Sequence, residues 1–510
     1  MLDEVNHSFN VKNDFNKGRD DMKEFVIGLD LGTTSVKAVM FTKDGKVKAE
    51  AEQLIKTFYT TDGHAEQDPD VIVSSAVFAL KSVLDETGAS AENILGIGFS
   101  SAMHSLICTD GDGHALSKAM IWADGRSRKQ AKELMSSKGP DFYKLTGTPI
   151  HPMSPLTKLI WMKETGYAPY LESGYIMSIK EYIIYQWFNE RVTDYAMAAA
   201  TGMMNGQTLT WDEEILNTAG LKEEQLGETV SADYQLTELN PIIANYLKLP
   251  QDIPFVVGSA DGQLANLGSS GLEENCLTIS AGTSGAVRKW TNRFNVSNGQ
   301  EVFCYAFTPE HYITGGPTNN GGVAIDWLKK TLNYHGTYEE LIMEAEAVSP
   351  GADGLLFLPY INGERAPLWD QDARGSLIGL SISHGIPQYA RAVLEGITFN
   401  LYQIYLSLGT AGEEAEVIYV NGGLSRSTLW VQILSDIFNK PVQRTESHHS
   451  AAWGAAWLVL TSLGEKSSLQ QIKENIPLGE RVEPDEEQHK EYVKIYERYS
   501  KFVKAVMEDV

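Results

Sequence analysis

The residue types best suited to binding phosphate lie in two short turns of similar sequence. The first turn is in Asp30-Leu-Gly-Thr-Thr-Ser35-Val-Lys37, and the second is Gly282-Thr283-Ser284-Gly285. A glycine has no Cβ to keep a ligand away, so backbone N–H groups and hydroxyl groups of such a turn can surround phosphate oxygens. Two opposed turns could hold a triphosphate from both sides, although each turn alone is equally compatible with an ordinary polar hairpin.

Two carboxylates each stand near the end of an apolar run. Asp30 follows the run that begins at Phe25, and it could hold Mg²⁺ through water. Asp261 follows the apolar run PFVVGSA and precedes Gly262. A base that accepts the proton of a substrate hydroxyl would be needed at such a place. An Asx turn or a helix N-cap also favours Asp before Gly, so spacing alone leaves the role of Asp261 open.

Other turns offer groups suited to a nucleotide ring or a polyol. Gly422-Gly423 stands between a predicted strand and a predicted helix, where a flat ring could approach the backbone and Ser427 could reach a purine edge. Three further turns mix polar and apolar side chains, as a polyol site requires; they contain His104, Trp122-Ala-Asp124-Gly-Arg126 and Thr148-Pro-Ile-His151-Pro-Met153. Tight strand–helix packing and ordinary loop chemistry are the alternatives for all of them.

The elements that would position these residues alternate between strands and helices. FVIGLDLG, from Phe25, is typical of a strand that enters a tight turn, and VKAVMF follows so closely that a hairpin is predicted. A helix is predicted after it, with Asp68 as its N-cap and Pro69 as its first residue. Strands and helices continue to alternate along the chain, which predicts the α/β class.

A faint internal repeat indicates two copies of one domain. LDLGTTSVKAVMF near residue 30 resembles ISAGTSGAVRKW near residue 280, and the copies are expected to meet around residues 255–275. A chain of 510 residues is also too long for one ordinary domain, so two large domains around a cleft are expected. We place them at residues 23–268 and 269–510, after a flexible, polar leader at residues 1–22.

Composition excludes several classes of function. Lys and Arg number 42 and Asp and Glu 67, so the net charge is −25, which disfavours binding to nucleic acid or to an anionic membrane surface. No apolar run is long enough for a membrane span, and the polar first residues do not form a signal peptide. Cys108, Cys276 and Cys304 are too sparse for a disulfide framework, so a cytoplasmic location is expected.

Taken in this order, the motifs resemble those of the FGGY carbohydrate kinases, a family of the actin/Hsp70/hexokinase ATPase superfamily. Met153-Ser-Pro-Leu-Thr-Lys158-Leu-Ile-Trp161 resembles one family signature. Gly375-Ser-Leu-Ile-Gly379-Leu through Ala392-Val-Leu-Glu395 resembles the other, with Tyr389 where an aliphatic residue is more usual. FSSAMHS, IWADGRS, TGTPIHPMSPLTK and GADGLLFLPYINGERAPLW resemble the branch of the family that phosphorylates gluconate. The resemblance implies two ribonuclease-H-like α/β domains around a deep cleft.

The resemblance also implies an activity and a set of site residues. The activity is the ATP-dependent phosphorylation of D-gluconate to 6-phospho-D-gluconate, with Asp261 as general base and Asp30 near Mg²⁺. The residues implied for the nucleotide are Gly32, Thr33, Thr34, Ser35, Lys37, Gly282, Thr283, Gly322, Asp326, Gly422, Gly423 and Ser427. Asp326 and Ser427 stand where some relatives have amides. The residues implied for the sugar acid are Met103, His104, Asp124, His151, Met153 and Asp261.

Several alternatives stay open from the sequence. Xylulokinases share a Met-His pair like Met103-His104, so xylulose or another sugar is the nearest rival substrate, whereas Ala102-Met103 replaces the Arg-Glu pair of glycerol kinases. An actin- or chaperone-like ATPase with a protein partner is a more remote alternative. The cationic partner of the gluconate carboxylate could be His104, His151, Lys158 or Lys180, and a structural role is the alternative for the two lysines. A homodimer is expected from the resemblance.

Overall fold

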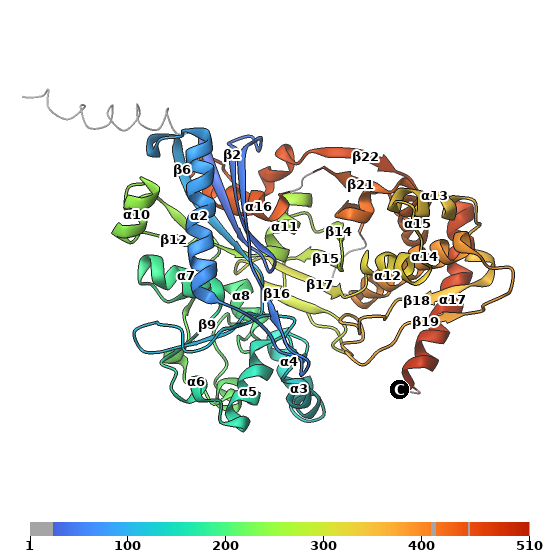
Figure 1. The fold of residues 1–510 in the computed structure, drawn as a ribbon, viewed down its shortest axis with the longest axis horizontal. Helices are drawn as coiled ribbons and strands as arrows, with labels where there is room; N and C mark the ends of the chain where they lie inside the picture. Colours follow the sequence, from blue (N-terminus) through green and yellow to red (C-terminus); the bar gives the residue numbers. More distant parts are fainter. Residues whose placement is uncertain (1–23, 410–414, 447–448, 509–510) are drawn as a thin grey trace, which may run out of the picture.

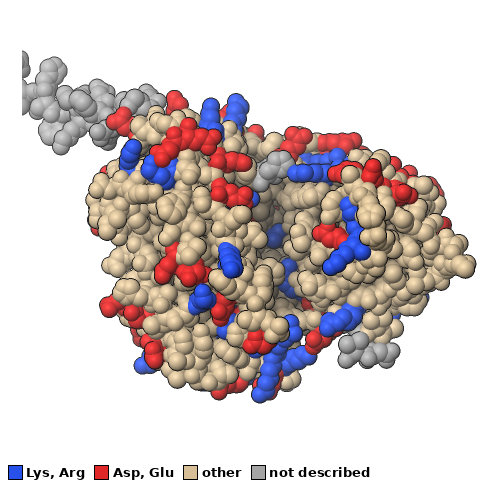
Figure 2. Space-filling model, viewed as in Figure 1, with Lys and Arg blue, Asp and Glu red and all other residues tan. Residues whose placement is uncertain are grey.

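The computed structural model describes residues 24–409, 415–446 and 449–508. The predicted leader, residues 1–22, therefore lies outside the described residues. Two sheet-rich domains make up the molecule, one on each side of Figure 1. The space-filling view in Figure 2 shows a hollow between them, with acidic and basic side chains interspersed over this face.

The first large sheet is six-stranded and has the order β12-β13-β6-β1-β2-β3. β1 pairs with β2 in antiparallel register, Asp30 opposite Lys37, while β6 is parallel both to β1 and to β13. The predicted hairpin is therefore confirmed. The strands are β1 (Phe25–Leu31), β2 (Ser35–Thr42), β3 (Val47–Leu54), β6 (Ile94–Ser101), β12 (Gln235–Leu236) and β13 (Phe255–Ala260).

The second large sheet is seven-stranded and has the order β16-β17-β15-β14-β20-β21-β22. β14 and β15 form an antiparallel hairpin, while β20 is parallel both to β14 and to β21. The strands are β14 (Cys276–Ala281), β15 (Gly285–Thr291), β16 (Phe303–Ala306), β17 (Tyr312–Thr318), β20 (Val417–Asn421), β21 (Val442–Thr445) and β22 (Leu478–Val482).

The two sheets share one strand order and one set of directions. The run β3-β2-β1-β6-β13 corresponds to β17-β15-β14-β20-β21, with two antiparallel pairs followed by two parallel pairs in each sheet. The internal repeat seen in the sequence is therefore a repeat of structure, and the predicted α/β class is confirmed. Because the copies match, the turn after β1 and the turn after β14 occupy equivalent places.

Helices pack against both large sheets (Figure 1). In α2 the predicted cap is present, since the Asp68 side chain accepts a hydrogen bond from the backbone N–H of Val71 and Pro69 is the first helical residue. The α-helices are α2 (Pro69–Thr87), α3 (Arg128–Met135), α4 (Gly139–Thr146), α5 (Pro155–Thr165), α6 (Ala168–Leu171), α7 (Ile179–Phe188), α8 (Tyr195–Ala200), α9 (Glu213–Ala219), α10 (Pro241–Leu247), α11 (Asp261–Ser270), α12 (Val323–Thr331), α13 (Tyr338–Glu346), α14 (Ile386–Ser407), α15 (Thr428–Phe438), α16 (Ser450–Ser462) and α17 (Glu486–Glu508).

The remaining elements are short. The small β-strands are β4 (Phe58–Tyr59), β5 (Ala65–Gln67), β7 (Ile107–Thr109), β8 (Ala119–Met120), β9 (Tyr175–Met177), β10 (Val192–Asp194), β11 (Glu228–Val230), β18 (Leu356–Leu358) and β19 (Ser376–Ile378). The 3-10 helices are η1 (Ala91–Asn93), η2 (Glu223–Gln225), η3 (Ala352–Gly354), η5 (Gly423–Arg426) and η6 (Leu469–Asn475). Within the described ranges, every helix is too short or too polar to cross a membrane.

The two halves of the chain interlock through α11 and α16. Figure 1 shows α16, which belongs to the C-terminal half of the sequence, beside the first sheet. Glycines allow this approach, because a Cβ added at Gly28 would lie 2.0 Å from the carbonyl oxygen of Ala452, and one at Gly98 would lie 2.3 Å from that of Ala455. α11 packs against α16 from within residues 255–275, where the copies were expected to meet.

Candidate active site

One turn separates two cavities. The turn that joins β14 to β15 lines a cavity of about 590 Å³ with Gly282 and Thr283. The same turn lines a second cavity, of about 210 Å³, with Ser284 and Gly285. A group that reached past this turn from the larger cavity would enter the smaller one. The geometry therefore suits the transfer of a group between two bound molecules.

The larger cavity collects most of the nucleotide residues implied for the second half of the chain. Gly322 and Asp326 reach it from the start of α12, while Gly423 and Ser427 reach it from the turn before α15. Two of these side chains are engaged with the protein: Asp326 accepts a hydrogen bond from the Tyr338 hydroxyl, and the Ser427 hydroxyl caps α15 through the N–H of Trp430, at 3.1 Å.

Gly422 acts behind this cavity. Its φ is 93°, in the left-handed region that favours glycine. A Cβ at this position would lie 2.6 Å from the backbone of Ala281. The glycine therefore lets the turn after β20 lie against β14 and does not itself line the cavity.

Asp261 lines the smaller cavity from the junction of β13 and α11. It is the first residue of the helix, and its Oδ1 accepts a hydrogen bond from the N–H of Gly262 at 2.6 Å. Burial and the nearby charge of Asp30 together raise the pKa of Asp261 to about 6, against the opposing positive charge of Arg288. A carboxyl with such a pKa can accept a proton near neutral pH.

Asp30 is the last residue but one of β1 and lies close enough to Asp261 for their charges to interact. Its Oδ1 accepts a hydrogen bond from the Ser100 hydroxyl at 2.7 Å. Burial raises its pKa, while that hydrogen bond and the charge of Lys37 lower it. Lys37 lies opposite Asp30 on β2 and forms a half-exposed ion pair of 3.4 Å with Glu52.

The first turn exposes fewer hydroxyls than the sequence suggested. Thr33 accepts a hydrogen bond on its hydroxyl from the Trp122 indole at 3.1 Å and another on its carbonyl oxygen from Gln67 at 2.5 Å. Ser35 is buried and hydrogen-bonded to Glu52. Thr34 is exposed, and Gly32 is half-buried beside it. The turn therefore offers a ligand its backbone N–H groups, the exposed Thr34 hydroxyl and the O–H donor of Thr33, which the bond from Trp122 does not use.

The Met-His pair lies on the wall of the smaller cavity. Met103 and His104 line it together with Met153. His104 has a φ of 68°, which is uncommon for a residue with a side chain, and its Nδ1 lies 2.9 Å from the carbonyl oxygen of Ala200. Burial lowers the pKa of His104 to about 3, so the ring is neutral at pH 7 and Nδ1 donates to that carbonyl.

Asp124 and His151 do not line this cavity in the structure. The Asp124 carboxylate is buried and accepts hydrogen bonds from the Arg126 guanidinium and from the N–H of Ala65. His151 accepts a hydrogen bond on Nδ1 from the N–H of Met153 at 3.1 Å. Both side chains thus support neighbouring segments of the wall.

Two arginines that line the smaller cavity were not predicted from the sequence. Arg288 reaches it from β15 and Arg365 from the segment after β18. The sequence did contain a signal for Arg288, which interrupts the buried run GAVRKWT. Because side chains two residues apart on a strand share a face, Arg288 lies on the same face as Ala286. Arg365 lies in an irregular segment, where no periodicity indicates the direction of a side chain.

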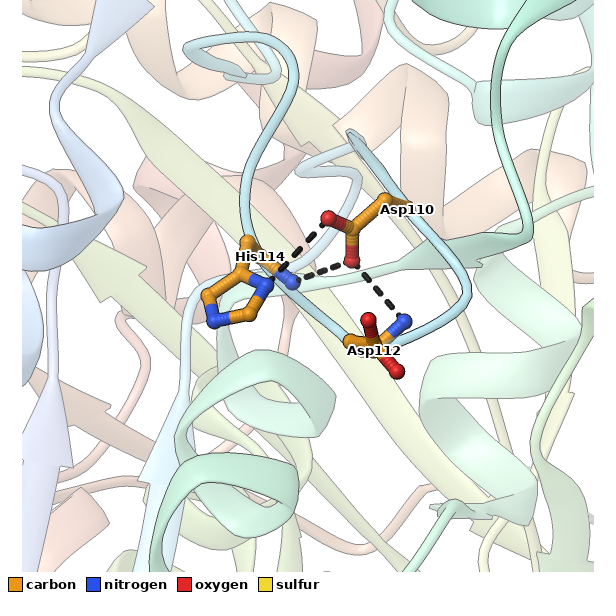
Figure 3. A group of neighbouring side chains, drawn as sticks. All are labelled: Asp110, Asp112 and His114. Atoms are coloured by element: carbon orange, nitrogen blue, oxygen red, sulfur yellow. Dashed lines mark hydrogen bonds and ion pairs between the residues drawn. The ribbon is translucent and has the colours of Figure 1, made fainter.

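Asp110, Asp112 and His114 lie apart from this site, and their possible ligand atoms are within 4.8 Å of one another, close enough to hold a metal ion (Figure 3). The Asp110 carboxylate accepts hydrogen bonds from the N–H groups of Asp112 and His114, both at 2.9 Å, and pairs with the His114 ring at 3.2 Å. These bonds are those of an Asx turn at the surface. We therefore assign the group to the stability of that turn.

The fold and the two adjoining cavities define a two-domain phosphotransferase with an actin-like ATPase fold. The sequence models of the FGGY family of carbohydrate kinases match residues 25–268, for the N-terminal domain, and 277–463, for the C-terminal domain. The chain belongs to the FGGY family of carbohydrate kinases. It is a kinase that transfers a phosphoryl group to an alcohol.

Individual relatives extend along nearly the whole chain. Gluconokinase of Bacillus subtilis is 38% identical over 484 residues, which cover 92% of this chain and 94% of the relative. The crystal structure of gluconate kinase from Lactobacillus acidophilus superposes with a TM-score of 0.92 at 32% identity, covering 94% of this chain and 98% of that one. A ligand-bound xylulose kinase from the same organism has the same TM-score and identity, with coverages of 95% and 98%.

Proposed function

We propose that this protein catalyses the ATP-dependent phosphorylation of D-gluconate to 6-phospho-D-gluconate. The observation that carries the proposal is the turn Gly282–Gly285, which lines both the larger cavity and the cavity that contains Asp261. A nucleotide in the larger cavity would direct its terminal phosphate past this turn. The terminal hydroxyl of a sugar acid in the smaller cavity would meet it there.

The larger cavity offers the groups that a nucleotide requires. Glycine backbone at positions 282, 322 and 423 can approach the phosphates and the adenosine closely. The first turn, with Gly32, Thr34 and the backbone of Thr33 and Ser35, would bind phosphate oxygens from the opposite side. Lys37 would act through its positive charge beside Asp30. The acidic chain can thus bind a triphosphate through local N–H groups, whatever its net charge.

Asp261 would act as the general base. It would accept the proton of the C6 hydroxyl as that oxygen attacks the γ-phosphorus, forming the new O–P bond. The bond between the γ-phosphorus and the oxygen bridging to the β-phosphate would break, and ADP would leave with that electron pair. The N–H groups of the Gly282–Gly285 turn would stabilise negative charge on the phosphoryl oxygens.

Asp30 fits the requirements of a Mg²⁺ ligand. The Ser100 hydroxyl donates its hydrogen bond to Oδ1 of Asp30 and does not engage Oδ2. Mg²⁺ is commonly bound by one or two carboxylates together with waters and phosphate oxygens. When bound, the ion would neutralise charge on the transferring phosphoryl group. Asp30 would hold the ion from the end of β1, and the charge interaction with Asp261 would weaken accordingly.

Gluconate is favoured over xylulose by the gluconokinase relatives, which share more sequence with this chain than the xylulose kinases do. Xylulose is the second candidate, because a xylulose kinase superposes equally well. An enzyme-linked assay of ADP release should be run with gluconate, D-xylulose, glycerol and unfolded peptide. We expect gluconate to give the highest kcat/KM. A higher value with D-xylulose would replace the proposed substrate, and stimulation by peptide alone would favour the ATPase alternative.

A further inference from the structure

The smaller cavity carries more positive charge than a neutral polyol needs. Its lining includes two guanidinium groups, those of Arg288 and Arg365, and one carboxylate, that of Asp261. Neither arginine forms an ion pair with a carboxylate in the part of the chain that the structure describes. Charges held near a cavity without a protein counter-ion are available to an anionic ligand.

Arg288 is held in a definite orientation. Its Nη1 donates a hydrogen bond to the Ser280 hydroxyl at 3.2 Å, across the hairpin of β14 and β15. A guanidinium has five N–H donors, so this bond leaves an edge for a second acceptor. Gly262 makes room for the group, because a Cβ at that position would lie 3.0 Å from Nη2. Gly262, which follows the proposed base Asp261, thus leaves space for the Arg288 guanidinium.

Arg365 lies on the same cavity with an incomplete set of partners. Its Nη2 donates to the carbonyl oxygen of Thr318 at 3.1 Å, while its Nε is buried without a partner among the described residues. The neighbouring carboxylate of Glu364 favours the charged form of Arg365, but its Oε2 accepts hydrogen bonds from Thr318, Asn320 and Asn400 and not from the guanidinium. A buried donor left in this way is satisfied when a ligand or water accepts from it.

The four cations considered from the sequence are otherwise engaged. Lys158 donates to the carbonyl oxygens of His104 and Ile121, both at 2.8 Å. Lys180 pairs with Asp194 in the protein interior. Burial lowers the pKa of both His104 and His151 to about 3, so neither ring is charged at neutral pH. The two arginines are therefore the charged donors that the cavity offers to a carboxylate.

We propose that Arg288 binds the carboxylate of the sugar acid substrate and that Arg365 supplies the second positive charge of this subsite. The inference rests on the proposed function and deepens it, since it names residues that select a sugar acid over a neutral sugar. A planar guanidinium can hold a carboxylate through two parallel N–H···O bonds, which a hydroxyl group cannot reproduce. Selection would then come from Arg288, on β15, while Asp261, on the other domain, serves the reacting hydroxyl.

The test compares an acid with its neutral counterpart. Arg288→Met and Arg288→Lys should be assayed with gluconate and with D-glucitol, which has the same carbon chain and no carboxylate. Arg293→Met is the matched control, because Arg293 is exposed just beyond the end of β15. For Arg288→Met we expect KM for gluconate to rise about tenfold to a hundredfold. At pH 9, above the acid limb set by Asp261, kcat/KM for D-glucitol and KM for ATP should stay within about twofold, and Arg288→Lys should recover part of the loss.

Calorimetric titration of gluconate onto Asp261→Asn, with and without Arg288→Met, measures the same loss without turnover. A melting profile like that of the unmodified chain shows that each variant is folded. An unchanged gluconate affinity in Arg288→Met, or an equal loss with D-glucitol, would overturn the inference. Failure of the proposed function gives a different result, because the unmodified chain would then not phosphorylate gluconate. That result would also overturn the proposed carboxylate subsite.

Discussion

At the scale of single residues, the proposed chemistry depends on a carboxyl with an altered acidity. Burial and the charge of Asp30 raise the pKa of Asp261, and Arg288 restrains the rise. Arg288 would then have two effects, on substrate binding and on the base. Substitutions of Asp261 and of Arg288 can be told apart, because the first should lower kcat and the second should raise KM for gluconate.

Replacing the proposed base tests its role directly. Asp261→Asn keeps the size of the side chain and removes the proton acceptor, so we expect kcat to fall by about 10²–10⁴-fold. The affinity for an ATP analogue should change little, since Asp261 lies in the cavity on the far side of the Gly282–Gly285 turn. Steady-state kinetics and calorimetry give the two quantities. A kcat near that of the unmodified chain would rule out Asp261 as the base.

The pH dependence of kcat/KM should report the same carboxyl. A base works when deprotonated, so activity should be lost as pH falls through about 6 and should level off above it. Because Arg288 lowers the pKa of Asp261, Arg288→Met should shift this acid limb to higher pH. Profiles measured from pH 5 to 9 with the exposed Arg293→Met as control decide the matter. An acid limb that stayed in place in Arg288→Met would contradict the assigned charge interaction.

At the scale of elements, the close contact between α16 and the first sheet joins the two halves of the chain. Gly28 and Gly98 face the backbone of Ala452 and Ala455, so the helix lies against the strands with no side chain between them. One cluster of buried side chains then includes residues of the first sheet, of α11 and α16, and of the second sheet. The position of Asp261 at the start of α11 depends on this packing.

A methyl group at this contact should therefore destabilise the protein. Gly28→Ala places a Cβ 2.0 Å from a backbone oxygen, so the helix must move, and overpacking of this kind costs about 1–3 kcal/mol. Gly111→Ala is the control, because its Cβ would have no described atom within 4 Å. Chemical denaturation measures both. Equal stability of the two variants would show that α16 does not lie as close to β1 as the structure has it.

At the scale of the whole molecule, the site is completed by residues from both domains. Asp30 and Asp261 come from the first sheet and the helix that follows it, whereas Arg288 and the Gly282–Gly285 turn come from the second sheet. Each substrate would thus contact groups of both halves. Binding of one should restrict the relative motion of the domains and favour binding of the other.

Gluconate and a non-hydrolysable ATP analogue should therefore bind cooperatively. We expect the Kd of the analogue to fall about fivefold or more at saturating gluconate, which lies within the usual range of coupling between sites. The reciprocal titration should give the same factor. Arg288→Met should weaken the effect at a fixed gluconate concentration, while Arg293→Met should not. Identical Kd values with and without gluconate would show that the two cavities are independent.

The sequence alone determined much of this protein. Glycines, hydroxyls and carboxylates are local signals, so the two turns, Asp261 and the repeat of the hairpin were readable, and the capped helix at Asp68 followed from its own residues. The α/β class followed from the same alternation of apolar runs and turns. Family signatures added the expected activity.

Only the tertiary structure decided which side chains face the cavity. From the sequence, Lys158 and Lys180 could serve either the substrate carboxylate or the structure, and carbonyl oxygens and a buried carboxylate from distant segments engage them. Asp124 is similarly engaged by Arg126, whereas Arg288 and Arg365 reach the cavity. The physical reason is that a charge is buried only with partners or a ligand, and those partners are brought together by packing between elements far apart in the sequence.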